Sequence, residues 1–425
     1  MRNLLLAGVA LGAVAAFVSA TPARAEDPAA VFPVTSETDL AGYNGPSLNG
    51  AAPGSVQVNL GGRTFSALWF QNNPSGTPTY NKSPQPQFMQ YFFLYPGFDY
   101  ASPSGVHFGA QAEIRVTSST QGQGSGSNTT APVPWFHQAF TYVSSAQFGK
   151  VQFGEPSGAL VANSVGTGDD FGTGLFFGWY GTSPYVPWVM ADAVDNYITN
   201  QKVVYTSPVW SGFNAAISWQ PSAVSMNYAD NLTLGQAPGA VGLLSRNRVE
   251  IAAKYVGTFS GVGVKANGGY VFSGAEKAGY ATIAQDVSYG NFGAQLLVAG
   301  FELEGSVSVG KFNAQIADNG NPNGPLPVGA KGSTAFVVGA GYQTGPVKFG
   351  GVYYHVSYDA ADFGGPLGQT GTISGEGLGG SYTVGPGVVT YLDFITANFD
   401  TVNVNSGKYG TQHPLGLGLG TFFTW

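Results

Sequence analysis

Residues 104–117 read SGVHFGAQAEIRVT, and this stretch alternates between two kinds of side chain. Every second residue from Val106 to Val116 is apolar, whereas the residues between them, from His107 to Thr117, are polar or glycine. Period-2 alternation is typical of a β-strand with one face in apolar surroundings and the other in water. Residues 55–65 (SVQVNLGGRTF) and 246–255 (RNRVEIAAKY) alternate in the same way.

The composition predicts where such strands lie. Charged residues make up 9% of the chain, against about 25% in an average soluble domain. Glycine is abundant, with 64 residues, aromatic residues reach 14%, and the mean hydropathy is +0.04. Beyond the N-terminus no apolar run is long enough for a membrane-spanning helix, which needs about 18 residues. These features exclude a helical membrane protein and favour a transmembrane β-barrel, whose alternating strands average to neutral hydropathy. The chain has no Cys, which excludes a disulfide scaffold.

The N-terminus predicts export. Residues 1–25 combine Arg2, an apolar run and the triplet Ala23-Arg24-Ala25, which indicates a signal peptide cleaved after Ala25. This leader holds two of the 16 basic residues and none of the 23 acidic ones, so the mature chain has a formal net charge of −9. Such a balance argues against nucleic acid as a partner. We expect residues 26–54 to be a poorly ordered periplasmic lead-in and residues 55–425 to form the barrel.

The chain contains sixteen candidate strands, and their connections alternate between tight turns and long loops rich in Gly, Asn, Ser and Pro. This pattern predicts an all-β fold, a 16-stranded antiparallel transmembrane β-barrel with both termini in the periplasm. In lipid the sheet must close on itself, and sixteen strands leave a water-filled lumen. The predicted strands are 55–70, 87–98, 105–118, 134–145, 147–155, 200–207, 211–221, 246–258, 261–273, 286–299, 301–313, 333–344, 346–358, 374–385, 387–398 and 412–425.

The third long loop, residues 156–199, is unusually long and apolar. It carries eight aromatic residues and no Lys or Arg. We expect it to fold into the lumen with its aromatic side chains packed on the wall and its carboxylates facing the pore, which makes it a constriction loop. The acidic residues are Asp169, Asp170, Asp192 and Asp195, and the basic wall residues with inward parity are Arg63, Arg115, Arg248 and Lys254. Opposed charges across the constriction favour small polar solutes.

Several segments resemble the trimeric general porins of Gram-negative bacteria. They are TYVSSAQFGKVQFGEP before the third loop, KVVYTSPVWSGFNAAISWQP after it, and SYGNFGAQLLVAGFELEGSVSVG at 288–310. The resemblance implies a homotrimer in outer-membrane lipid and lipopolysaccharide, passive diffusion, and a constriction of Asp169 and Asp170, then Asp192 and Asp195, facing Arg63 and Arg115. General porins often have more wall arginines, so we expect a mild cation preference here.

Two alternative functions are a solute-selective channel and an enzyme. In a solute-selective channel, Trp179, Tyr180 and Trp188 would stack on sugar rings, although packing of the third loop on the wall explains these residues too. An enzyme would need a nucleophile beside a base, and none of the four His residues lies in a recognisable catalytic motif. No metal-ligand spacing occurs, so no metal or other cofactor is expected.

The chain ends in LGLGLGTFFTW, residues 415–425. The alternation predicts that Leu415, Leu417 and Leu419 face lipid while the glycines between them leave the lumen wall clear. Phe423 and Trp425 also fall on the outward face, where an aromatic belt at the membrane interface favours them. In the family that the chain resembles, a terminal aromatic strand is also the signal read by the barrel-assembly machinery. Phe423 and Trp425 are therefore the expected assembly signal.

Overall fold

The computed structural model describes residues 51–71, 86–117, 134–166, 182–183, 186–187, 201–222, 245–275, 285–312, 328–359, 367–400 and 415–425. These residues form eighteen strands and one short helix, α4 (Ala159–Asn163). The strands are β1 (Val56–Gln71), β2 (Gln87–Ala101), β3 (His107–Thr117), β4 (Trp135–Ser145), β5 (Gly149–Gly154), β6 (Thr182–Ser183), β7 (Val186–Pro187), β8 (Lys202–Thr206), β9 (Phe213–Ser222), β10 (Ser245–Phe259), β11 (Val262–Ala275), β12 (Val287–Val298), β13 (Phe301–Lys311), β14 (Ser333–Thr344), β15 (Val347–Asp359), β16 (Thr370–Gly385), β17 (Val388–Asp400) and β18 (Leu415–Thr424).

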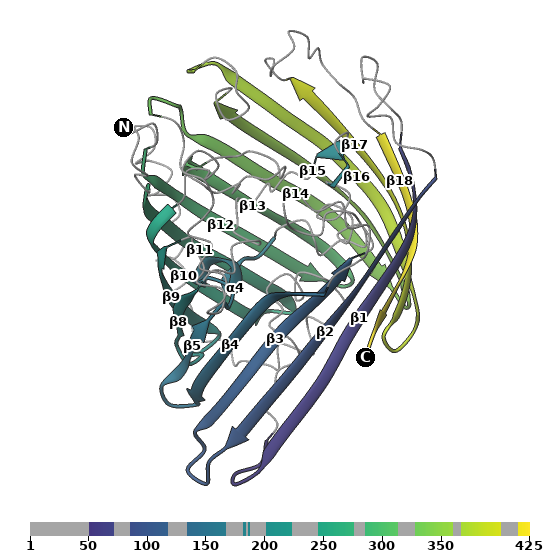
Figure 1. Cartoon of the computed structure of the whole chain (residues 1–425). Coiled ribbons are helices and arrows are strands. Elements are labelled where there is room, and N and C mark those ends of the chain that lie inside the picture. The colour runs from purple at the N-terminus through teal and green to yellow at the C-terminus, as the bar shows by residue number, and fades with distance from the viewer. Residues whose placement is uncertain are drawn as a thin grey trace.

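Sixteen of the described strands, all except β6 and β7, form one closed antiparallel barrel (Figure 1). Each strand pairs with its neighbours in the chain, and the last strand, β18, pairs with β1 to close the sheet. The structure therefore confirms the predicted 16-stranded all-β fold. β6 and β7 form a separate two-stranded sheet within the third loop, residues 156–199. No helix among the described residues is long and apolar enough to cross a membrane.

Burial alternates along the strands as the sequence predicts. On β1, the side chains of Val56, Val58 and Leu60 are more than half exposed on the outer surface, whereas Arg63 and Phe65 on the opposite face are buried. The same alternation runs along β12, β13 and β15. Large apolar side chains thus cover the outside of the barrel, which suits contact with lipid.

Tight turns connect the strands at one end of the barrel, which we call the short-turn end. Ser260 and Gly261 both have positive φ angles, 49° and 83°, and Ala299 and Gly300 repeat the pattern at 49° and 82°. Two successive positive φ angles define the two-residue turn that matches the twist of antiparallel strands. Glycine occupies the second position of both turns, where the larger φ angle would strain a residue with a side chain.

The barrel closes between the last residue and β1. The backbone N–H of Trp425 donates to the carbonyl of Gly62 at 3.1 Å, and the N–H of Gly62 donates to the carbonyl of Trp425 at 3.0 Å. The indole lies on the outer face 5.5 Å from the ring of Phe92, measured between centroids. It occupies the space that a side chain at Gly62 would need. The final residue is therefore part of the sheet.

The glycines of β18 have a different role from the one expected. A Cβ atom at Gly416 would collide with the Trp69 indole, and one at Gly420 would collide with the Tyr391 ring. The prediction that these glycines leave the wall clear is wrong at both positions. Large rings from β1 and β17 lie across β18, because only glycine leaves room for them. The Tyr391 ring also stacks on Phe65 at 5.7 Å, with an angle of 3° between the two planes.

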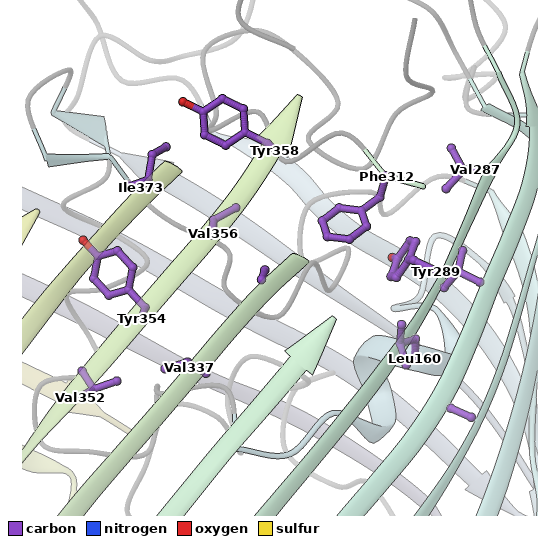
Figure 2. Close-up of a cluster of buried hydrophobic side chains, with 13 residues drawn as sticks. Leu160, Val287, Tyr289, Phe312, Val337, Val352, Tyr354, Val356, Tyr358 and Ile373 are labelled. Atoms are coloured by element: carbon purple, nitrogen blue, oxygen red, sulfur yellow. The ribbon is translucent and has the colours of Figure 1, made fainter. Parts of the chain in front are cut away.

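A second group of buried apolar side chains gathers on the inner face of β10–β16 (Figure 2). Tyr289 and Phe312 lie with ring centroids 5.1 Å apart, and Leu160 of α4 belongs to the same group. These side chains thus pack against each other and against α4.

Candidate pore lining and constriction

The predicted basic residues Arg63 and Arg115 lie on the inner face of neighbouring strands with one phenylalanine between them. Arg63 is directly opposite Phe93 in the β1–β2 pairing, and Phe93 is directly opposite Arg115 in the β2–β3 pairing. Each guanidinium carbon lies 4.7 Å from the centroid of the Phe93 ring. Cation–π contacts of this kind hold a guanidinium at a fixed position. The two arginines therefore form one row across β1–β3.

Arg115 also has an acidic partner. Its Nε lies 2.5 Å from Oε1 of Glu113, and the second carboxylate oxygen of Glu113 lies 3.2 Å from Nδ1 of His137. Glu113 and His137 are both buried. The charge of Arg115 is therefore partly balanced within the wall. Alternation places Glu113 and Arg115 on one strand face but does not show that they pair.

The start of the third loop is bound to the inner wall through its backbone. The N–H of Ala159 donates to Ser218 Oγ at 3.1 Å, and the N–H of Leu160 donates to Glu250 Oε2 at 2.9 Å. Farther along, the N–H of Val165 donates to Asn267 Oδ1 at 3.1 Å. Side chains from β9, β10 and β11 thus accept hydrogen bonds from the loop segment that contains α4.

Two side-chain hydrogen bonds reinforce this attachment. Gln138 Nε2 donates to Ser157 Oγ at 2.9 Å, and Asn214 Nδ2 donates to Asn163 Oδ1 at 2.9 Å. The chain also approaches the wall too closely for a side chain at Gly293, where a Cβ atom would collide with the carbonyl of Val165. Residues 157–165 therefore lie directly against the inner face of β4 and β9–β12.

Arg248 and Lys254, the other predicted basic wall residues, also lie on inward positions of β10. Arg248 is 1% exposed; its Nε donates to Glu250 Oε1 at 2.8 Å, and its Nη2 donates to the Tyr289 hydroxyl at 3.1 Å. Arg248 thereby orients the carboxylate that holds Leu160. Lys254 is half-buried and lies opposite Asn214 and Asn267 in the strand pairing. The alternation in RNRVEIAAKY indicates the faces of these residues but not their partners.

A later segment of the third loop reaches another part of the wall. β7 lies against β17, which is seven positions from β10 in the strand order of the barrel. In a ring of sixteen strands this separation is close to the full diameter. The predicted acidic residues Asp169, Asp170, Asp192 and Asp195 lie outside the described residues, and so do Trp179, Tyr180 and Trp188.

The predicted assembly signal lies where the alternation places it, since Phe423 and Trp425 are both exposed on the outer face. Of the His, Asp and Glu side chains in the described ranges, no three are grouped in a way that could hold a metal ion.

A family model described as Gram-negative porin matches residues 9–401 of the chain. The chain belongs to this family. Porins are channels of the outer membrane, and the closed barrel with its apolar outer surface is the form that such a channel takes. A comparison with curated protein sequences found no match.

Solved porin structures share this fold at low sequence identity. OmpF of Salmonella typhi, solved in complex with daunomycin, is 15% identical with a TM-score of 0.54, covering 87% of this chain and 97% of that one. An anion-selective porin from Comamonas acidovorans is 15% identical with a TM-score of 0.54, covering 87% and 100%. OmpT of Vibrio cholerae, in its trimer form, is 15% identical with a TM-score of 0.52, covering 87% and 99%. At this identity the likeness concerns the fold.

Proposed function

We propose that this porin is a water-filled channel for the passive diffusion of small hydrophilic solutes and ions, with a mild preference for cations. The observation that carries the proposal is the attachment of the third loop to the inner wall at Glu250. A loop bound inside a 16-stranded barrel narrows the lumen without closing it, and a narrow polar passage selects solutes by size and charge.

The constriction is formed by the third loop on one side and the wall of β1–β3 on the other. In support, the loop contacts β8–β11 through α4 and β17 through β7, and β17 is seven positions from β10 in the strand order of the barrel. Asp169, Asp170, Asp192 and Asp195 are the acids of this loop, and Arg63 and Arg115 are the basic groups that face them. The aromatic residues of the loop pack it against the wall.

The cation preference follows from the balance of charge. The chain carries 23 acidic and 16 basic residues. Two wall arginines, Arg115 and Arg248, are already paired with Glu113 and Glu250. With little unbalanced positive charge on the wall, the loop carboxylates set the sign of the potential in the passage.

The membrane setting completes the proposal. Residues 1–25 direct export, residues 26–54 lie in the periplasm, and both termini are periplasmic. The barrel spans an outer membrane of lipid and lipopolysaccharide as a homotrimer, a state that agrees with the trimer form of the Vibrio cholerae structure. The barrel-assembly machinery reads Phe423 and Trp425 during insertion.

Purified protein in a planar lipid bilayer tests the proposal. We expect conductance steps in groups of three and a cation-selective reversal potential across a potassium chloride gradient. A silent bilayer would overturn the channel, and an anion-selective reversal potential would overturn the acidic constriction. Steps that occur only singly would overturn the trimer.

A further inference from the structure

A polar cluster outside the constriction lies on the inner face of β2–β5, at the short-turn end. At its centre is Asp99, which is fully buried and accepts two hydrogen bonds. The hydroxyl of Tyr142 donates to Oδ1 at 2.7 Å, and Nδ1 of His107 lies 2.8 Å from Oδ2. Each carboxylate oxygen of Asp99 thus has a partner, and Asp99 serves to orient Tyr142 and His107.

The bond to Asp99 determines which nitrogen of His107 remains available. A carboxylate only accepts hydrogen bonds, so Nδ1 carries the proton in that contact. In the neutral imidazole, Nε2 is then an acceptor. The His107 side chain lies on the inner face of β3 and is 21% exposed.

Hydrogen-bond donors lie beside this acceptor in one row. His107 is directly opposite Ser144 of β4, and Ser144 is directly opposite Lys150 of β5. Residues paired in this way present their side chains on the same face of a sheet, with neighbouring strands about 4.8 Å apart. Three polar side chains from three strands therefore line one strip of the inner wall.

The donor groups of Ser144 and Lys150 form no hydrogen bond with other described residues. The Lys150 ammonium lies 4.6 Å from the centre of the Tyr142 ring and 5.8 Å from that of Phe140, and it forms no ion pair or hydrogen bond with the described residues. The next inward residue of β5 is Gln152, which is 5% exposed and whose Nε2 has no hydrogen-bond partner there. A buried amide donor without a partner costs free energy unless a ligand or water satisfies it.

We propose that His107, Ser144, Lys150 and Gln152 form a binding site for hydrogen phosphate on the channel wall. The site rests on the proposed channel function, because a solute reaches this wall only through the lumen. Lys150, Ser144 and Gln152 donate to phosphate oxygens, and the protonated oxygen of hydrogen phosphate donates to Nε2 of His107. Sulfate has the same shape and charge but carries no proton at neutral pH, so it leaves Nε2 without a donor.

The experiment measures block of the potassium chloride current by added anions at about pH 7.5, where a phosphate monoester has lost the last proton of its phosphate group. Inorganic phosphate is compared with sulfate at matched ionic strength. We expect phosphate to reduce the wild-type current at a concentration roughly tenfold below that of sulfate. A phosphate monoester, which has no proton on its phosphate group at this pH, should behave like sulfate. Block by the monoester at the phosphate concentration would overturn the role given to His107.

Variants separate the site from the general charge of the lumen. Lys150→Gln should weaken phosphate block about tenfold and Ser144→Ala about threefold, whereas His107→Phe should abolish the difference between phosphate and sulfate. Lys265→Gln is the matched control, because Lys265 is also an inward lysine near a tight turn, on β11. Equal loss in Lys150→Gln and Lys265→Gln would overturn the site.

The unblocked conductance of each variant reports whether its barrel is intact. If Lys150→Gln does not form channels, Ser144→Ala and His107→Phe decide the outcome. Wild-type channels that conduct but respond equally to phosphate and sulfate refute the site and leave the channel function standing. Wild-type protein that does not conduct refutes the channel function itself.

Discussion

The backbone N–H of Leu160 donates a hydrogen bond to Oε2 of Glu250, with 2.9 Å between the nitrogen and the oxygen. Glu250 lies ninety positions later in the chain. The other oxygen of Glu250 accepts from Arg248, so a single buried carboxylate connects the third loop to the wall of β10. A hydrogen bond to an ionised carboxylate is stronger than one between neutral groups. This contact is therefore the part of the loop attachment that substitution should affect most.

Replacing Glu250 with Gln should loosen α4 and lower the stability of the barrel. The change weakens the bond to Leu160 and leaves the buried Arg248 without its counter-charge, a loss of about 3 kcal/mol in the free energy of unfolding. The measurement is denaturant unfolding of the refolded protein, followed by tryptophan fluorescence.

The double variant Arg248→Met with Glu250→Gln separates the two effects. Removing the unpaired charge should recover most of the stability. The conductance of both variants should be higher and noisier than that of the wild type, because the third loop has lost its charged hydrogen-bond acceptor. Glu376→Gln, at an exposed position on β16, is the control. Unchanged stability in Glu250→Gln would contradict the role of this carboxylate.

Gly416 should not tolerate a side chain. Alanine at this position collides with the Trp69 indole, which must then leave its place over β18, at a cost of about 1–3 kcal/mol. The heat-modifiable mobility of the barrel in detergent gels measures this effect as a lower melting temperature. Gly385→Ala is the matched control, since a Cβ atom there meets no atom within 4 Å. Equal melting temperatures for the two variants would contradict the packing of Trp69.

Deletion of Trp425 should impair assembly more than conductance. The deletion removes both backbone hydrogen bonds to Gly62 and the contact with Phe92, and the indole that is lost lies on the outer face, away from the lumen. The measurement is the fraction of folded protein in isolated outer membranes, set beside single-channel conductance of the molecules that do fold. Phe349→Ala, another exposed aromatic residue on the outer face, is the control. Normal assembly of the truncated chain would rule out Trp425 as the signal.

Replacing both Asp169 and Asp170 with Asn should reduce the preference of the channel for cations. Removing two negative charges from the constriction weakens the potential that attracts cations and repels anions. The reversal potential across a salt gradient should move toward the anion side, and Arg63→Gln should move it in the opposite direction. Asp286→Asn, at an exposed position beside β12, is the control. No shift in the double variant would place the constriction elsewhere on the third loop.

Alternation along the chain was sufficient to predict the barrel. The strand faces around Val58, His107 and Val249 can be assigned from sequence because side chains in a strand point to opposite faces in turn, whatever the neighbouring strand is. The alternating loop lengths predicted the antiparallel order, because a tight turn can join only two strands that run in opposite directions. The sequence also placed Arg63, Arg115, Arg248 and Lys254 on the inner wall.

Contacts between distant strands could not be predicted in this way. The Leu-Gly repeat of β18 suggested an open wall, whereas Trp69 and Tyr391 fill the space over its glycines. The bond from Leu160 to Glu250 and the row formed by His107, Ser144 and Lys150 likewise depend on register, which is set by the pairing of whole strands. The sequence by itself thus determined the environment of each strand face. Only the tertiary structure decided which side chains meet. The free energy of pairing two segments that lie far apart in the chain sets the register between them, and this register produces no periodic pattern in the sequence.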